Sequence, residues 1–290
     1  MTRPLKPFEY LEPTTVEEAV QFLKKYGTRA RVFAGNVDLV ARMRQRLVTP
    51  QYVISLLGIP GLDYIQSDEA GLRFGALTTI RSIERSPVVE KTYVALHEAA
   101  SQIASVQVKT MATVVGNLCV ATPASDIAAA LYALGARLKI VGPGSEKTVS
   151  LEDFYVGVNQ TVLKPDEIVT GVIVPSPAQQ TGGAFLKLVR TASDIAKINV
   201  AVILTVTDNT CKEAKVVLGA VAPTVMRATR AEEALRNSKL EPETVEKAAR
   251  LAAQEAKPIT DLRSTLEYRS EMVTVLVRQA VEKALTRARA

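Results

Sequence analysis

Two segments with the same order of residue types constrain this chain more than any other feature. In each segment, β-prone residues lead into a Gly-Asn pair, and an aspartate follows. The segments span residues 31–39, with Gly35-Asn36, and residues 112–126, with Gly116-Asn117. Glycine and asparagine tolerate left-handed backbone, which lets successive N–H groups point the same way and hold an anion. Each segment therefore predicts a strand that ends in an anion-binding turn.

The two turns, about eighty residues apart, suit one long ligand better than two short ones. A diphosphate in the middle of such a ligand fits backbone donors from both sides, which points to a dinucleotide. A plainer alternative is that Gly35 and Gly116 only permit turns. Likewise, Asp38 and Asp126 could be helix N-caps, which is a common role for aspartate.

Length and composition describe a globular chain of several domains. At 290 residues the chain exceeds the usual size of one compact core, so two or three domains are expected. No apolar run reaches the roughly 18 residues that a membrane span requires. The N-terminal residues are basic but lack an apolar signal core, so the cytoplasm is the predicted location.

Charge and reactive side chains argue against several classes of function. The net charge of +6 comes from 36 basic residues among 30 acidic ones, without tryptophan, so nucleic-acid binding is not expected. The densest basic cluster, residues 42–46, is interpreted as a solvated or subunit-facing surface. Cys119 and Cys211 form no CxxC pair and His97 is the sole histidine, which leaves metal sites, iron–sulfur clusters and a Ser-His-Asp triad with little support.

The first region, residues 1–50, is predicted to be a small α/β unit. Capping-box sequences at residues 14–18 indicate the start of a helix, and Gly27 is placed to end it. A buried strand at residues 29–34 leads into the first Gly-Asn turn, and a helical segment at residues 39–47 follows.

The second region, residues 51–177, combines strands with helices. The predicted strands are residues 52–57, 71–76, 137–141 and 167–174, and the predicted helices are residues 82–104, broken near Pro87, and 125–134. Residues 142–147 resemble a phosphate loop only superficially, because the glycine pattern is incomplete and no helix follows. A hairpin turn at Pro143-Gly144 is the better interpretation.

The third region, residues 178–290, is predicted to be an antiparallel sheet covered by helices. Its three strands are expected at residues 184–188, 199–207 and 214–222. Three helices follow, the first capped by residues 229–232, the second opened by Pro242 and the third at residues 262–288. The overall class is α+β in three domains.

These segments, taken in order, resemble the FAD-binding medium subunit of the molybdenum hydroxylases, the family of xanthine dehydrogenase and aerobic carbon monoxide dehydrogenase. The resemblance rests on the two turns, on residues 185–199, and on residues 219–224 and 268–272 in the third region. It covers nearly the whole chain. It implies two FAD-binding subdomains of the PCMH type, followed by a three-stranded antiparallel sheet with a three-helix bundle.

The resemblance also implies an FAD site, with FAD as the cofactor and no metal in this chain. Backbone N–H groups of both turns would hold the diphosphate, and the residues assigned to FAD are Val32, Phe33, Ala34, Gly35, Asn36, Val37, Asp38 and Leu39 from the first segment and Thr113, Val114, Val115, Gly116 and Asn117 from the second. Asp126 would hold a sugar or ribityl hydroxyl, and Cys119 would lie close to the flavin ring. Lys187 would lie near the ring edge, where a cation stabilises anionic reduced flavin.

Ile103 and Val169 complete the implied site. Ile103 would make an apolar contact where some relatives stack an aromatic ring on adenine, and Val169 would lie in the strand that supports the cofactor. The plainer alternatives remain open for two other residues: Lys187 as a solvated strand lysine, and Cys119 as a small buried apolar residue.

Two departures from the family pattern leave the affinity for FAD open. Val37 stands where bacterial members commonly carry a threonine, so a hydroxyl that could bind phosphate is missing. Val115 replaces the first glycine of a usual Gly-Gly-Asn.

The function that the resemblance implies is electron transfer. A separate large subunit would bind the molybdopterin cofactor, and a small subunit would carry two [2Fe–2S] clusters. This chain would pass their electrons to an outside acceptor, within an expected dimer of heterotrimers. Two alternatives are a stand-alone FAD-dependent oxidase and a structural subunit that has lost its flavin.

Overall fold

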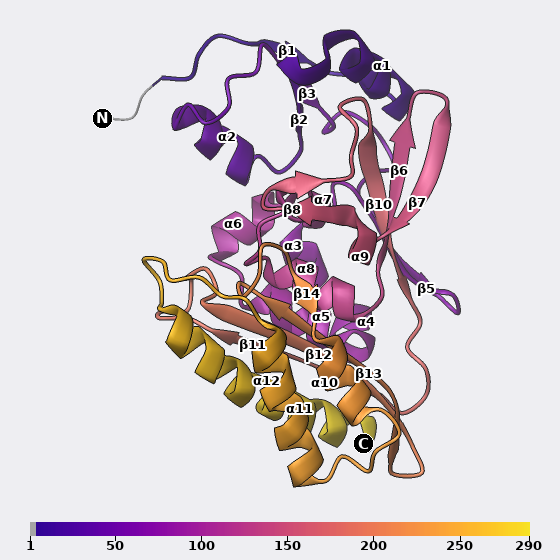
Figure 1. Cartoon of the computed structure of the whole chain (residues 1–290). Coiled ribbons are helices and arrows are strands. Elements are labelled where there is room, and N and C mark those ends of the chain that lie inside the picture. Colours follow the sequence, from indigo (N-terminus) through magenta and orange to yellow (C-terminus); the bar gives the residue numbers. More distant parts are fainter. Residues whose placement is uncertain (1–3) are drawn as a thin grey trace.

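The computed structural model describes residues 4–290 and has the α+β architecture that the sequence predicts (Figure 1). The predicted first domain and the prediction about the N-terminal segment also include residues 1–3, which lie outside the described residues. No helix within residues 4–290 is long and apolar enough to cross a bilayer; the longest, α12 (Leu266–Ala288), is too polar.

A small parallel sheet forms the N-terminal end of the molecule (Figure 1). Its strand order is β1 (Glu9–Leu11), β3 (Tyr52–Ser55) and β2 (Ala30–Phe33). Helix α1 (Val16–Tyr26) buries one apolar face and is capped by Thr15, whose hydroxyl accepts from the N–H of Glu18. Gly27 ends α1 with a positive φ of 54°, as predicted, and opens the short 3-10 helix η1 (Gly27–Arg29). Strand β2 lies at the sheet edge and leads into the first Gly-Asn turn and helix α2 (Val37–Arg44).

A five-stranded antiparallel sheet follows. Its strand order is β4 (Ile65–Asp68), β5 (Gly71–Gly75), β10 (Ile168–Pro175), β6 (Arg137–Gly142) and β7 (Ser145–Ser150). The strands predicted from their apolar runs, β5, β6 and β10, are confirmed. The outer strands β4 and β7 were missed because they are mostly exposed and carry few apolar residues. Pro143-Gly144 forms the predicted turn between β6 and β7, with Gly144 at a φ of 68°.

Short helices pack between this sheet and the third one. They are α3 (Ile80–Glu84), α4 (Pro87–Thr92), α5 (Val94–Ser101), α6 (Val106–Met111), α7 (Val114–Val120), α8 (Asp126–Ala133) and α9 (Leu151–Phe154). The hairpin β8 (Tyr155–Gly157) and β9 (Gln160–Thr161) follows α9. The predicted break at Pro87 is confirmed, since this proline is the first residue of α4.

The strand predicted at residues 113–115 is wrong, because these residues begin helix α7. Thr113 caps the helix by accepting from the N–H of Gly116 at 3.0 Å, and Val114 and Val115 are buried in the core. Capping and burial outweigh the weak strand preference of β-branched residues.

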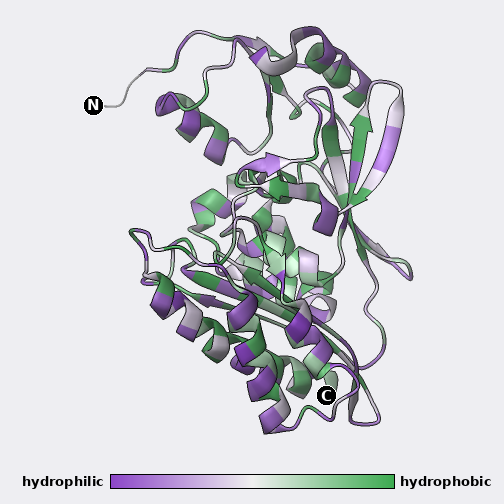
Figure 2. Cartoon of the chain, viewed as in Figure 1, coloured by the Kyte–Doolittle hydropathy of each residue, from purple (hydrophilic) through white to green (hydrophobic). Residues whose placement is uncertain are grey.

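The third sheet is antiparallel, with β11 (Thr181–Leu188), β12 (Ile198–Thr207), β13 (Thr210–Gly219) and β14 (Met226–Arg227) in this order. The prediction of three strands therefore missed the two-residue strand β14. Helices α10 (Thr229–Leu235), α11 (Pro242–Glu255) and α12 cover one face of the sheet (Figure 1). Helices α5 and α8 pack on the other face. Figure 2 shows hydrophobic residues along the strands and hydrophilic ones on the outer sides of α11 and α12.

The predicted helix starts in this region are only partly right. Pro242 opens α11, as expected. The proposed cap at residues 229–232 is wrong, because Ala228 is the N-cap of α10. The carboxylate of Glu232 instead accepts from the N–H of Val216 and from Arg227, inside the sheet–helix interface. Helix α12 begins at Leu266 rather than near residue 262 and is capped by Thr265.

Candidate cofactor site

The two Gly-Asn segments lie in direct contact. A Cβ added to Gly35 would collide with the backbone oxygen of Met111 and would lie 2.8 Å from the nitrogen of Thr113. Only glycine permits this approach, which brings the first turn against the residues that begin α7. In the sequence, the two segments are related only by their similar order of residue types. The structure shows that they are also neighbours in space.

The first turn carries features that fit an anionic ligand. Of the four paired glycines and asparagines, Asn36 alone has a positive φ, at 61°, so the predicted left-handed turn occurs only here. Its Nδ2 donates to the oxygen of Ala34 at 2.6 Å, whereas its buried Oδ1 has no partner among residues 4–290. Helix α2 begins at the next residue without a side-chain cap, so its positive dipole end is available to a ligand.

Neither aspartate of the two segments is a helix N-cap. Asp38 lies in the first turn of α2, exposed, with its carboxylate 3.8 Å from Arg42. At α8 the N-cap is Ser125, whose hydroxyl accepts from the N–H of Ala128 at 3.0 Å. The alternative that both aspartates cap helices is therefore wrong.

Two cavities of about 540 Å³ each flank strand β2 and the first turn. One is lined by Phe33, Asn36 and Val37 of the predicted site and by further residues, Val40, Ala41, Arg44, Gln45 and Met111. Val32 lines the other cavity, which lies between the free edge of β2 and the hairpin β8–β9. Space for a ligand therefore borders the turn on the side of α2 and borders strand β2 on the side of the hairpin.

A buried ion pair joins two further predicted residues. Lys187, on β11, donates to Asp126 Oδ2 at 2.7 Å and to the oxygen of Gln102 at 3.1 Å. Their side chains are only 2% and 6% exposed, so the interpretation of Lys187 as a solvated lysine is wrong. Burial raises the pKa of Asp126, and the Lys187 ammonium and the Asn199 amide oppose that rise.

Asn199 is a residue of this cluster to which the sequence reasoning gave no role. It is fully buried on β12, and its Nδ2 donates to Asp126 Oδ1 at 2.7 Å. The available signal was a polar residue just before the apolar run at residues 200–204 of this strand. Asn117 connects the second turn to the same cluster, because its Oδ1 accepts from the hydroxyl of Ser125 at 2.5 Å.

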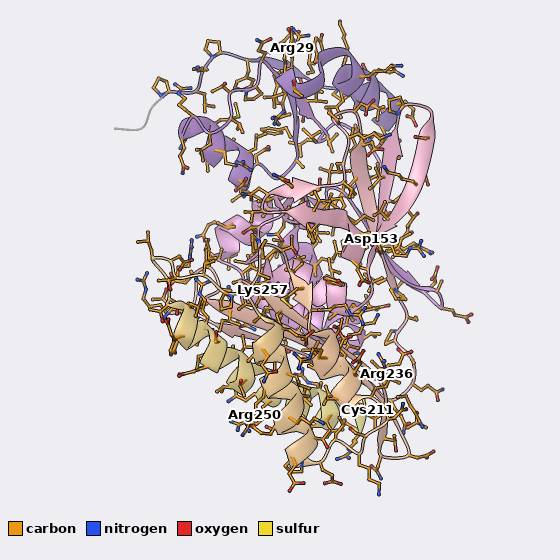
Figure 3. The ribbon with its side chains drawn as sticks, in the orientation of Figure 1. Arg29, Asp153, Cys211, Arg236, Arg250 and Lys257 are labelled. Atoms are coloured by element: carbon orange, nitrogen blue, oxygen red, sulfur yellow. The ribbon has the colours of Figure 1, made fainter. Side chains whose placement is uncertain are left out.

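Cys119 lies near the end of α7 and fits the interpretation as a small apolar residue. Burial raises the pKa of its thiol to about 12, which keeps the thiol protonated and unreactive near neutral pH. Tyr155 of β8, another residue without a predicted role, has a buried hydroxyl that bonds to no group within residues 4–290. Cys211 is remote from these residues and lies beside Arg236 at the far end of the third sheet (Figure 3).

The remaining predicted residues lie in different parts of the fold. Ile103 follows Gln102 at the end of α5 and is half-buried. Val169 lies in the central strand β10 and is packed into the core beside a register shift against β6. Leu39 lies in the first turn of α2, and His97 is half-buried on α5 with no hydrogen bond from its Nδ1 to any described residue.

Comparison with known proteins identifies the class. Residues 6–177 match the FAD binding domain in molybdopterin dehydrogenase, and residues 183–284 match the CO dehydrogenase flavoprotein C-terminal domain. The fold and site thus define a flavoprotein that combines this FAD-binding region with this C-terminal domain.

Full-length relatives show the same arrangement. The chain is 33% identical to the carbon monoxide dehydrogenase medium chain of Afipia carboxidovorans, over 97% of this chain and 98% of that protein. It is 28% identical to the glyceraldehyde dehydrogenase medium chain of Sulfolobus acidocaldarius, over 95% and 98%. The solved carbon monoxide dehydrogenase of Hydrogenophaga pseudoflava superposes with a TM-score of 0.95, at 32% identity, over 98% and 99% of the two chains. The chain belongs to the family of FAD-binding medium subunits of the molybdenum hydroxylases.

The residues present fit FAD, the cofactor of this family. The unpartnered Oδ1 of Asn36, the space that the absent side chain of Gly35 leaves, and the uncapped start of α2 form a polar cradle beside two cavities. Such a cradle of backbone donors suits a diphosphate and requires no buried cation.

Proposed function

We propose that this subunit passes electrons from the [2Fe–2S] clusters of a small partner subunit to an external acceptor, within a complex whose large subunit binds the molybdopterin cofactor. The observation that carries the proposal is the match over 98% of the length of a carbon monoxide dehydrogenase medium chain, with both domains in the same order. A subunit called a medium chain implies a complex that also contains a small and a large subunit. When bound, FAD supplies the exchange between one-electron and two-electron carriers.

The residues of this chain would then bind and orient the cofactor. Backbone N–H groups of residues 34–38 and 113–117 hold the diphosphate in this proposal, and Asp126 accepts from a sugar or ribityl hydroxyl. Lys187 and Cys119 lie near the flavin ring, Ile103 near adenine, and Val169 in the supporting strand. The proposal is supported by the close approach of Gly35 to residues 111–113 and by the buried Asp126–Lys187 pair at 2.7 Å.

The assembly and location are part of the same proposal. We expect a dimer of heterotrimers in the cytoplasm, with three domains predicted at residues 1–50, 51–177 and 178–290. Strand β3 (Tyr52–Ser55) pairs with β1 and β2, which moves the first limit beyond residue 55. Native mass spectrometry of the purified complex measures its stoichiometry, and cell fractionation tests its location. Limited proteolysis with sequencing of the new termini tests the domain limits.

The decisive experiment is co-purification with the partner subunits, followed by separation of the chains and analysis of each one. We expect FAD on this chain, and iron and molybdenum only on the partners. Iron bound by this chain alone would contradict the proposal. Oxidation of a substrate by the isolated, FAD-loaded chain would favour a stand-alone oxidase. No flavin absorbance after reconstitution with FAD would favour a structural subunit, a reading motivated by Val37 and Val115.

A further inference from the structure

Three adjacent strands of the third sheet place one residue each in a single row beside Asp126. Lys187 of β11 is the register partner of Asn199 of β12, and Asn199 is the register partner of Gly219 of β13. The row faces the first turn of α8, where Asp126 is buried. Segments 185–199 and 219–224, which carry part of the family resemblance, therefore lie next to each other beside Asp126.

Both carboxylate oxygens of Asp126 are held by this row. Oδ2 accepts from Lys187 and Oδ1 accepts from the amide of Asn199, each at 2.7 Å. The same amide lies 3.5 Å from the oxygen of Ala124, just before α8. Further hydrogen bonds to a buried ion pair help to fix its geometry, and Asn199 supplies one such bond to Asp126.

Gly219 makes room for Asn199. A Cβ at position 219 would lie 2.8 Å from Asn199 Cγ and would collide with Oδ1. Next to it, the N–H of Ala220 donates to the oxygen of Pro123 at 2.7 Å, so the end of β13 also holds the loop before α8. These contacts show a site built to fix Asp126, beyond what packing of an apolar strand requires.

We propose that Asn199 is a positioning residue of the cofactor site: it holds the Asp126 carboxylate and, through it, the Lys187 ammonium in the orientation that the cofactor meets. The inference rests on the proposed function. Lys187 donates to Asp126 and Gln102, and its third donor has no partner within residues 4–290. A lysine tethered in this way presents that donor in one direction.

The test compares Asn199→Asp with Asn199→Leu in the full chain. We expect Asn199→Leu to bind FAD about tenfold more weakly at all pH values, because it removes one hydrogen bond to a charged group. Asn199→Asp keeps the shape. At about pH 5 one of the two facing carboxyls is protonated and donates a hydrogen bond to the other, so FAD binding stays close to wild type. At about pH 9 both are carboxylates that share one lysine, and FAD binding weakens about tenfold.

The charged group in contact with this carboxyl pair is Lys187, and Glu98 of α5 accepts from the N–H of Phe185, two residues before Lys187. The control variant is Thr205→Val, which breaks the 2.8 Å Thr181–Thr205 hydroxyl pair further along the same two strands. It should leave FAD binding unchanged at every pH. FAD binding by Asn199→Asp that matches wild type at both pH values would overturn the inference.

A second measurement separates this inference from the proposed function. The melting temperature of the FAD-free chain, measured across the same pH range, should fall further below wild type for Asn199→Asp as pH rises, by about 3 °C or more. If the wild type takes up no FAD, the proposed function fails, yet this widening gap still supports the role of Asn199 in holding Asp126. A gap that stays constant with pH would overturn it.

Discussion

Gly35 has no Cβ, and this lets the first Gly-Asn segment pack against the backbone of residues 111–113. Its Cα lies against the backbone of Met111 and Thr113, so any side chain must push the first turn away from α7. We expect Gly35→Ala to lower the free energy of unfolding by about 1–3 kcal/mol, as for other overpacked sites, and to weaken FAD binding. Urea denaturation and FAD titration measure the two effects.

The matched control for this substitution is Gly58→Ala. A Cβ at Gly58 would meet only the oxygen of Pro13, at an ordinary 3.6 Å. We expect stability and FAD binding close to wild type. Equal behaviour of the two alanine variants would show that the contact at Gly35 does not constrain the site.

Val37 is a position where a substitution is expected to strengthen FAD binding. It is the first residue of α2, 38% exposed, and lines the cavity next to the turn. Val37→Thr keeps the shape and adds a hydroxyl, so we expect FAD to bind about two- to tenfold more tightly, the worth of one ordinary hydrogen bond. Titration of the apo chain with FAD, followed by fluorescence, measures the change. Unchanged or weaker binding would mean that this position does not face a polar part of the cofactor.

At the scale of elements, α7 is held at its start by one side chain. The hydroxyl of Thr113 accepts from the N–H of Gly116 at 3.0 Å. Thr113→Ala should lower the free energy of unfolding by about 1 kcal/mol through loss of the N-cap. It should also weaken FAD binding, because residues 113–117 of the proposed site lie at the start of α7. Thermal unfolding and FAD titration measure these changes.

Thr265→Ala is the control, since Thr265 caps α12 in the same way, by accepting from Tyr268. This cap lies in another domain, so we expect a similar loss of stability with unchanged FAD binding. If both variants lost FAD equally, the effect of Thr113 would reflect general destabilisation.

At the scale of the whole molecule, Glu98 connects the second region to the end of the chain. Its carboxylate on α5 contacts Arg287 and Lys283 of α12 at 2.7 Å each and accepts from the N–H of Phe185 at 2.9 Å. Burial alone would raise the pKa of Glu98, but the hydrogen bonds from Arg287, Lys283 and Phe185 outweigh it and hold the pKa below its usual value.

This shift predicts a pH-dependent contribution to stability. A carboxyl with a lowered pKa in the folded state stabilises the protein above its unfolded pKa of about 4.3 and loses that effect as pH falls through the folded pKa. We expect Glu98→Gln to reduce the free energy of unfolding by about 1–2 kcal/mol at neutral pH and by less below about pH 4. Denaturant unfolding at several pH values measures the difference between the two proteins.

Glu246→Gln is the control for Glu98. Glu246 is a surface carboxylate that contacts Arg250 and Arg278, within the helical layer alone. Exposed pairs of this kind contribute about 1 kcal/mol or less. A loss for Glu98→Gln no larger than for Glu246→Gln, or one that does not shrink in acid, would argue against a connecting role for Glu98.

The sequence predicted the elements whose signals are local. The capping threonine and terminal glycine of α1, the break at Pro87, the turn at Gly144 and the apolar runs of β5, β6 and β10 all depend on residues near one another in the chain. Strands β4 and β7 escaped prediction because an exposed sheet edge needs no apolar pattern. The family resemblance, carried by segments far apart in the sequence, correctly indicated how these elements combine.

By itself, then, the sequence determined the class of fold, its two matching Gly-Asn segments and the cofactor that they suit. Only the tertiary structure decided that residues 113–115 begin a helix, because Val114 and Val115 are buried in the core. It also decided that Lys187 is paired and that Asn199 belongs with Asp126. These facts depend on register between strands and on burial, and both arise from contacts between residues more than sixty positions apart.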